Sequence, residues 1–367
     1  MVIIEKSKIL CPVLNNAKVI TYEQKIIKFN KFKIILTYSL NKEKHNDKVI
    51  VFFPGYNNYF YYHNIRLLYP DYDFFSLDIP GYGFNGSNPD YPYEHNGIKV
   101  QPNYFDNVDN ICDMINTTLS TNYTEENDNI NIKKYSKKYL LGFSTGGFIA
   151  TYYVWKCDTK NNDYFKFDKL LLISPLVGYY INKNYVISSL INVVISFISL
   201  FNHKQNLKGD IGKQSPASDK LKTILSSIYS HMSVNNINNI NHYINTTNFD
   251  NILSKTRSGA YSGWINNINN SVSLMVKSKK KITTNVKLVC SLKHKIGNEF
   301  NADEFIMPDF IINNLNNIID KNKFSYKHFD CCHDAMIQPF SNYFQNIIDI
   351  EEITNISFIE IMNELIN

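Results

Sequence analysis

Short, mainly apolar runs recur along this chain, and they limit the folds it can adopt more than any other feature. They occupy residues 49–53, 74–77, 139–141, 170–173 and 286–290, and residues 324–329 fit a sixth run. Runs of this length, closed by proline, glycine, serine or aspartate, are typical of strands buried on both faces of a sheet. Helical patterns fill several gaps between them, around residues 105–119, 147–157 and 337–349. The alternation predicts an α/β protein with a mostly parallel central sheet and helices on both faces.

Two other segments have different patterns. Residues 17–40 alternate apolar and polar side chains on either side of Asn30-Lys31, which predicts an antiparallel hairpin. Residues 122–138 are mostly polar and interrupt the alternation of strands and helices. We interpret this second segment as a surface insertion.

More than a hundred residues separate the run at 170–173 from the run at 286–290. A crossover between neighbouring strands does not need so many residues, and a structureless loop of this length is uncommon. Because the segment has helical patterns, residues 178–284 are predicted to form an inserted helical cap. The α/β core would then comprise residues 1–177 and residues 285–367.

The most apolar stretch of the chain, residues 185–201, lies in this insertion. Its length is at the lower limit for spanning a bilayer, and it contains Asn192 and four serines. The first interpretation is a cap helix that shields an apolar pocket at the carboxyl ends of the strands, where such sheets bind ligands. Peripheral contact with a membrane surface is the second interpretation, and a transmembrane span is the third.

One motif carries recognisable chemistry. Gly142-Phe143-Ser144-Thr145-Gly146 joins the run at 139–141 to a helical pattern. Glycines at both ends allow a sharp turn from strand to helix, because they have no Cβ atom to clash across it. Such a turn presents the serine hydroxyl at the carboxyl edge of the sheet and at the positive end of the helix dipole. The motif therefore predicts Ser144 as a nucleophile.

A nucleophilic serine needs a base, and histidine is the usual one. When the serine follows a strand-to-helix turn of this kind, an acid and then the histidine come later in the chain. Two of the nine histidines, His328 and His333, lie near the last predicted strand. His328 falls inside the run at 324–329, where a side chain points into a face of the sheet. His333 lies in the following loop and is the better candidate.

The acid that orients this histidine is expected after the run at 286–290, where four carboxylates lie: Glu299, Asp303, Glu304 and Asp309. Asp303 is preferred, because its separation from His333 leaves room for a helix at 310–319 and the last strand. Asp309 lies nearer the start of that helix, where a capping role is expected. The other place for an acid, after residue 173, offers only Ser174-Pro175-Leu176.

Acyl transfer also needs N–H donors for the oxyanion. The backbone amide of Thr145, directly after the nucleophile, is one candidate. The turn Pro54-Gly55-Tyr56-Asn57 follows the run at 49–53, and Tyr56 is expected to supply the second amide. Asp78 ends the run at 74–77 and is expected to have a structural role.

Charge and cysteine pattern narrow the classes of partner. The formal net charge is +5 and the basic residues are scattered, which argues against a nucleic-acid partner. The six cysteines form no C-x-x-C pair and no secretory signal opens the chain, so reduced thiols and a cytoplasmic location are expected. No cluster has the spacing of metal ligands, so neither a metal nor a cofactor is expected. The oligomeric state is left open.

Several stretches of the chain match a known family: residues 49–61, 76–83, 138–150, 170–176 and 302–306, and Cys332-His333-Asp334. Together they resemble the serine aminopeptidase-like group of the α/β-hydrolase superfamily, which includes monoacylglycerol lipases and lysophospholipases. The resemblance runs from about residue 49 to residue 345 and leaves the cap unmatched. One departure is Pro54-Gly55, where the family usually has His-Gly.

The resemblance implies an α/β-hydrolase fold and a serine hydrolase. Ser144 would be the nucleophile, Asp303 the acid and His333 the base, with the amides of Tyr56 and Thr145 as oxyanion donors. The expected substrate is an acylglycerol, a lysophospholipid or a similar lipophilic ester, cleaved through an acyl-enzyme on Ser144. Two alternatives stay open: a catalytically silent binding protein of the same fold, and an acyltransferase that uses the same three residues.

Overall fold

The structure is a computed structural model of the 367-residue chain. It describes residues 3–12, 19–29, 32–40, 46–55, 71–78, 108–125, 128–160, 163–178, 185–202, 206–208, 260–292, 307–329 and 363–366.

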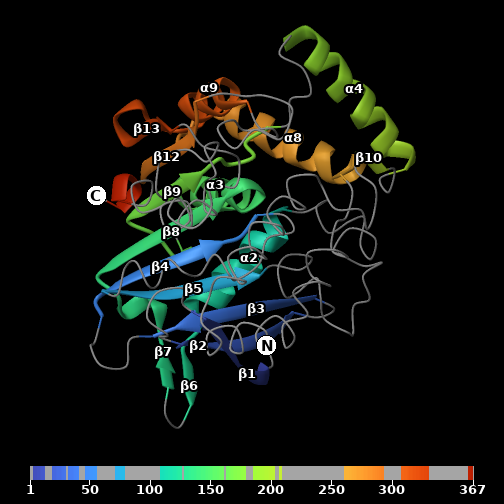
Figure 1. The fold of residues 1–367 in the computed structure, drawn as a ribbon. Helices are drawn as coiled ribbons and strands as arrows, with labels where there is room; N and C mark the ends of the chain where they lie inside the picture. The colour runs from blue at the N-terminus through green and yellow to red at the C-terminus, as the bar shows by residue number, and fades with distance from the viewer. Residues whose placement is uncertain are drawn as a thin grey trace, which may run out of the picture.

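A single large sheet runs through the described part of the chain (Figure 1). Its strands are, in order across the sheet, β1 (Ile3–Pro12), β2 (Val19–Phe29), β3 (Phe32–Ser39), β5 (Tyr72–Asp78), β4 (Lys48–Phe53), β8 (Lys137–Phe143), β9 (Lys169–Ile173), β12 (Asn285–Ser291) and β13 (Phe324–Phe329). The strands from β5 to β13 pair in parallel, and β1, β2 and β3 add to one edge as antiparallel strands. The predicted mostly parallel α/β sheet is confirmed.

The apolar runs of β4, β5 and β8 form strands whose residues are largely buried on both faces, which leaves few positions for polar side chains. All seven residues of β5 are buried, as are the last five of β4 and the last five of β8. The predicted hairpin at 17–40 is confirmed as β2 and β3, which pair around residues 30 and 31. The sequence pattern did not indicate β1, which pairs with β2 at the edge of the sheet.

Four described helices form a layer along the sheet: α2 (Val108–Ser120), α3 (Ser144–Thr159), α8 (Ser262–Lys277) and α9 (Pro308–Ile318). Each packs against the next, and the hydrophobic core lies between this layer and the strands. Helix α3 is central and almost entirely buried, which agrees with the apolar residues around its circumference. The helix predicted at 337–349 lies outside the described residues.

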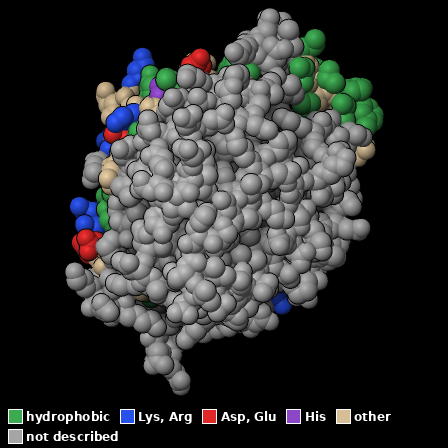
Figure 2. Space-filling model, viewed as in Figure 1, with side chains coloured by type: hydrophobic (Ala, Val, Ile, Leu, Met, Phe, Trp, Pro, Cys, Tyr) green, Lys and Arg blue, Asp and Glu red, His purple; other side chains and the backbone are tan. Residues whose placement is uncertain are grey.

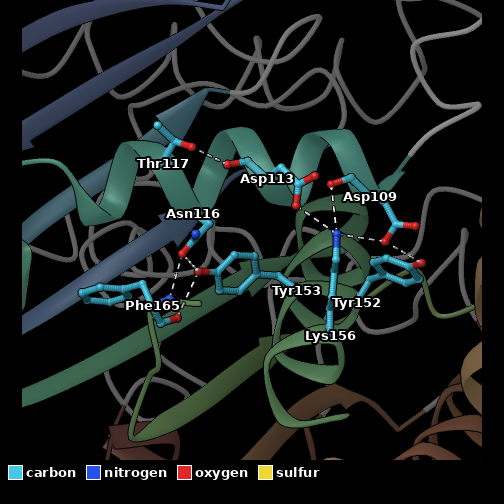
Figure 3. Close-up of polar contacts among 8 residues, drawn as sticks. All are labelled: Asp109, Asp113, Asn116, Thr117, Tyr152, Tyr153, Lys156 and Phe165. Carbon is cyan, nitrogen blue, oxygen red and sulfur yellow. Dashed lines mark hydrogen bonds and ion pairs between the residues drawn. The ribbon is translucent and has the colours of Figure 1, made fainter. Parts of the chain in front are cut away.

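Polar contacts fix α3 against α2 (Figure 3). Lys156 of α3 points between Asp109 and Asp113 of α2, with Nζ 3.1 Å and 3.0 Å from one carboxylate oxygen of each. Burial alone lowers the pKa of Lys156, but hydrogen bonds to Asp113 and Asp109 outweigh it, so the pKa is raised and the charge is kept. One turn along α2, Asn116 accepts a hydrogen bond from the backbone N–H of Phe165.

Part of the predicted insertion is described. Helix α4 (Tyr185–Phe201), strands β10 (Asn206–Lys208) and β11 (Ala260–Tyr261), and helix α8 follow β9 and precede β12. Helix α4 packs against α8 and stands away from the sheet (Figure 1). Within the described ranges, every helix falls short of the length and apolarity needed to cross a bilayer. The limits of the cap at residues 178 and 284 stay a prediction.

The segment at 122–138 is not purely a surface insertion, so that prediction is wrong in part. It forms a short hairpin of β6 (Tyr123–Glu125) and β7 (Asp128–Ile130), followed by a single 3₁₀ turn. Tyr123, Ile132 and Tyr135 are buried in the core. The Tyr135 hydroxyl donates a hydrogen bond to the Asp73 carboxylate, which satisfies its polar end inside the protein.

Candidate active site

Strand β8 ends at Phe143 and helix α3 begins at Ser144, as the motif predicted. The φ angle of Ser144 is 51°, a left-handed conformation that residues other than glycine rarely adopt. Holding a serine there costs about 1–3 kcal/mol, and the surrounding structure has to enforce it. The serine side chain is partly exposed, whereas Thr145 and Gly146 behind it are buried. The turn thus presents one hydroxyl group at the carboxyl edge of the sheet.

The glycines of the motif allow α3 to lie directly against two strands. A Cβ atom on residue 146 would lie 2.1 Å from the carbonyl oxygen of Phe53 and 2.3 Å from that of Pro54, at the end of β4. A Cβ atom on Gly142 would lie 2.7 Å from the Cα atom of Gly147. Side chains at these positions are therefore excluded by backbone atoms, and this close approach forces the chain into the sharp turn at Ser144.

The electrostatics of this turn favour a negative charge near Ser144. The first N–H groups of a helix have no acceptor within the helix, and the N–H of Thr145 is one of them in α3. These N–H groups and the helix dipole place partial positive charge at the start of α3. The arrangement is suited to stabilising an oxyanion beside the serine.

A second strained turn lies next to the first. Ser174 directly follows β9 and has a φ of 40°. Phe143 and Ile173 are paired in the sheet, so Ser144 and Ser174 leave neighbouring strands at the same level. The N–H of Leu176 donates to the carbonyl oxygen of Ser144 at 2.8 Å. This turn therefore helps to hold the backbone of the candidate nucleophile.

The same turn is tied to helix α9. The Asn314 side chain is buried and donates a hydrogen bond to the carbonyl oxygen of Val177 at 2.7 Å. Sequence reasoning missed both the turn and Asn314. The signal available was Ser174-Pro175 after an apolar run, which indicates a turn but not its contact with Ser144.

Two buried hydroxyl groups lie close to Ser144. One belongs to Thr145, the next residue in the chain, and the other to Ser174, which follows the neighbouring strand. Thr145 Oγ1 and Ser174 Oγ are buried, and neither has a hydrogen-bond partner among the described residues. Buried polar groups in a packed core nearly always have partners, because leaving one unsatisfied costs about 1–3 kcal/mol. Five other buried polar atoms in the described residues are also without a partner, so these two hydroxyl groups do not by themselves mark a site.

His328 is too far from Ser144 to act as its base. It lies in β13, and strands β9 and β12 separate β13 from β8. Three strand spacings amount to about 14 Å, well beyond hydrogen-bond reach. The ring atom Nδ1 of His328 instead lies 3.1 Å from the carbonyl oxygen of Ser291 in the neighbouring strand.

The other candidates fall in two groups. Tyr56, Asp303 and His333 lie outside the described residues, so their roles stay predictions. Asp309 lies in the first turn of α9 with an exposed side chain, but the N-cap is Met307, so the expected capping role is wrong. Asp78 is fully buried at the end of β5, and its structural role stays a prediction.

Three cysteines in the described ranges, Cys112, Cys157 and Cys290, are buried in the protein as free thiols. Burial raises the pKa of Cys157 to about 12 and that of Cys112 well above its usual value, so neither forms the reactive thiolate readily. No group of three or more His, Cys, Asp or Glu side chains within those ranges could hold a metal ion.

Comparison with known proteins agrees with this geometry. A sequence model described as the alpha/beta hydrolase fold matches residues 48–158, which include β4, β5, β8 and the turn at Ser144. No curated protein sequence matches the chain.

Solved structures are similar in fold. A soluble variant of monoglyceride lipase from Saccharomyces cerevisiae, in complex with a substrate analog, has a TM-score of 0.51 at 11% identity, covering 90% of this chain and 95% of that one. A monoacylglycerol lipase from Paleococcus ferrophilus has a TM-score of 0.44 at 14% identity, covering 86% and 96%. A serine hydrolase from the polyaromatic-hydrocarbon-degrading bacterium Cycloclasticus zankles has a TM-score of 0.46 at 14% identity, covering 90% and 97%.

Proposed function

We propose that this chain is a serine hydrolase of the α/β-hydrolase superfamily acting on carboxylic esters, because a model of that fold matches residues 48–158 and a monoglyceride lipase has a similar fold. The observation that carries the proposal is the turn at Ser144. A left-handed serine at a helix N-terminus, hydrogen-bonded to the turn after β9 and followed by a glycine that lies against the end of β4, is a costly arrangement for a purely structural residue. In a hydrolase the same arrangement serves to expose a nucleophile beside N–H donors.

In the proposed reaction, the Ser144 hydroxyl oxygen attacks the ester carbonyl carbon and its proton passes to His333, which Asp303 orients. The carbonyl oxygen becomes negatively charged and accepts hydrogen bonds from the backbone N–H groups of Thr145 and Tyr56. His333 then gives the proton to the alcohol oxygen as its bond to the acyl carbon breaks. A water molecule, deprotonated by His333, releases the acid and restores Ser144.

The proposed substrate is an ester with a lipophilic acyl group, such as an acylglycerol or a lysophospholipid. Two observations support this class. The helix that follows β9 in the chain is strongly apolar, and residues 178–284 are proposed to form a cap over the site. One solved structure of similar fold is a monoglyceride lipase in complex with a substrate analog. We also propose a cytoplasmic location, which agrees with the free thiols.

Labelling with a fluorophosphonate probe tests the nucleophile. The wild-type chain is expected to form one covalent adduct, and Ser144→Ala is expected to form none. Ser120→Ala, at the end of α2, is the matched control and is expected to label normally. Hydrolysis of a long-chain nitrophenyl ester should fall by about a thousandfold or more in Ser144→Ala.

The result also separates the alternatives. Labelling without ester turnover would favour an acyltransferase, for which an added alcohol acceptor should restore turnover. Absence of labelling in the folded wild-type chain would refute the hydrolase proposal and favour a silent binding protein. The feature that favours a silent binding protein is Pro54, which stands where the family usually has histidine. The carbonyl oxygen of Pro54 lies against Gly146, close to the candidate nucleophile.

A further inference from the structure

Helix α4 exposes a continuous apolar face. Six large apolar side chains on it are each at least half exposed: Leu190 (65%), Val193 (64%), Val194 (50%), Phe197 (62%), Leu200 (74%) and Phe201 (76%). Their spacing of three and four residues places them on one side of the helix. Figure 2 shows hydrophobic side chains gathered where α4 stands away from the body of the protein, without charged side chains among them. A contiguous patch of this kind usually marks a surface that binds something.

Three polar side chains of α4 face the protein instead of water. Ser196 donates to the Asn266 side chain of α8 at 2.7 Å, and Asn266 donates to Ser199 at 3.0 Å. One turn away, Asn269 donates to Asn192 at 3.0 Å. Surface helices of globular proteins have the opposite arrangement, with the apolar side inward. These hydrogen bonds, together with the buried Ile195, anchor α4 to the protein and leave the larger apolar face outward.

The charges around α4 indicate what covers this face. Residues 185–201 contain no charged side chain. In the sequence, Lys183 precedes the helix and Lys204 follows it, and no Asp or Glu occurs between Asp168 and Asp210. An uncharged apolar helix bordered by lysines in a stretch without acids has the composition of a helix that lies in a membrane interface, where lysines reach the phosphate groups.

The shape and polarity of α4 favour a lipid surface over a protein. A protein interface normally surrounds its apolar centre with polar groups that form hydrogen bonds across it. The polar groups of α4 described here are already engaged with α8. A projecting helix also needs a matching groove in a protein partner, whereas the acyl chains of a bilayer adapt to any convex surface. The helix is too short and too polar on its inner side to span a bilayer, so a parallel orientation is the one that fits.

We propose that α4 binds the surface of a phospholipid bilayer, lying parallel to it with the face from Leu190 to Phe201 among the acyl chains and the flanking lysines at the headgroups. This inference goes beyond the proposed hydrolase activity and does not rest on it, because binding is measured without turnover. Binding of α4 to a bilayer would also bring the proposed hydrolase close to lipophilic esters, which dissolve in membranes.

Vesicle co-sedimentation with the full chain tests the proposal. The vesicles are phosphatidylcholine alone, and phosphatidylcholine with a third of phosphatidylglycerol. The wild-type chain is expected to bind both and to bind the anionic vesicles more tightly. Phe197→Asp/Leu200→Asp is expected to lower the partition coefficient at least tenfold on both. Leu292→Asp is the matched control, because Leu292 is 56% exposed and lies beyond β12, and it is expected to bind as the wild type does.

Two further arms distinguish apolar contact from charge repulsion and from self-association. Phe197→Asn/Leu200→Asn adds no charge, so a loss of binding in this variant attributes the effect to apolar contact and not to repulsion by anionic lipids. Circular dichroism checks that each variant is folded. The proposal is overturned if the folded wild type binds neither vesicle, or if the α4 variants bind as well as Leu292→Asp. A concentration-dependent dimer in sedimentation, lost in the α4 variants while vesicle binding is absent, would assign the face to a second copy of the chain.

Discussion

Replacing Gly146 by alanine tests how closely helix α3 lies against strand β4. The added Cβ atom would lie 2.1 Å from the Phe53 carbonyl oxygen and 2.3 Å from the Pro54 carbonyl oxygen. Ordinary contact begins at about 3.4 Å, so the helix and the strand would have to separate by about 1.3 Å. Neither clash can be relieved by rotating a side chain, because both carbonyl oxygens belong to the backbone.

The size of the effect follows from two opposing terms. Overpacking a buried site costs about 1–3 kcal/mol, and contact with backbone on both sides argues for the upper end, about 3 kcal/mol. Alanine is a better helix former than glycine and returns up to about 1 kcal/mol. The free energy of unfolding should therefore fall by about 2 kcal/mol. A displacement of about 1 Å beside a reacting group can also cost a hundredfold in rate, so labelling of Ser144 should slow by about that factor.

Urea unfolding measures the first effect. The chain has two tryptophans, and both Trp155 of α3 and Trp264 of α8 are buried, so their fluorescence reports on the helix layer. Asn270→Ala is the control, because Asn270 is exposed on α8 and gains helix propensity without a new contact. A Gly146→Ala variant with unchanged stability and normal labelling would refute the close approach of α3 to β4.

The remaining predictions concern other parts of the structure. Asn314→Ala should lower the free energy of unfolding by about 1–3 kcal/mol, because the buried carbonyl of Val177 loses its donor, whereas Asn313→Ala on the exposed side of α9 should have little effect in the same urea experiment. Burial, followed by the charge of Tyr139, raises the pKa of Tyr72 to about 12. Near pH 10 the unfolded chain loses the Tyr72 hydroxyl proton, whereas the folded chain keeps it. The contribution of Tyr72 to the free energy of unfolding should therefore be fully present below pH 10 and be lost as the pH rises towards 12. The difference in phenolate absorbance between the wild type and Tyr72→Phe isolates this residue among the 26 tyrosines, and a difference that already appears near pH 10 in the folded chain would contradict this.

The strands and the nucleophile turn could be predicted because their signals are local. Residues 49–53 could be recognised as a buried strand because all five are apolar, and all five are buried in the structure. The sharp turn could be predicted from Gly142 and Gly146, because a tight turn from strand to helix needs a residue without a side chain on both sides of the serine. The hydroxyl at Ser144 could thus be placed at the edge of the sheet from its neighbours in the chain alone.

Contacts between distant segments could not be predicted. Tyr135 is buried although most residues around it are polar, because Asp73, far away in the chain, accepts a hydrogen bond from its hydroxyl group. The left-handed conformation of Ser174 has no sequence signal, since such positions usually hold glycine. The outward direction of the apolar face of α4 was equally hidden, because the same composition suits a helix whose apolar side faces a pocket.

The hydrogen bonds between α4 and α8 join neutral amides and hydroxyls. None of these groups takes up or releases a proton in the pH range in which proteins stay folded, and ionic strength weakens only interactions between charges. Neither acidification nor salt acts directly on these contacts. A vesicle experiment repeated at rising salt would therefore report on the attraction between lysines and headgroups, while the two helices remain joined as before. The apolar and ionic parts of membrane affinity in this protein are separable by the choice of buffer.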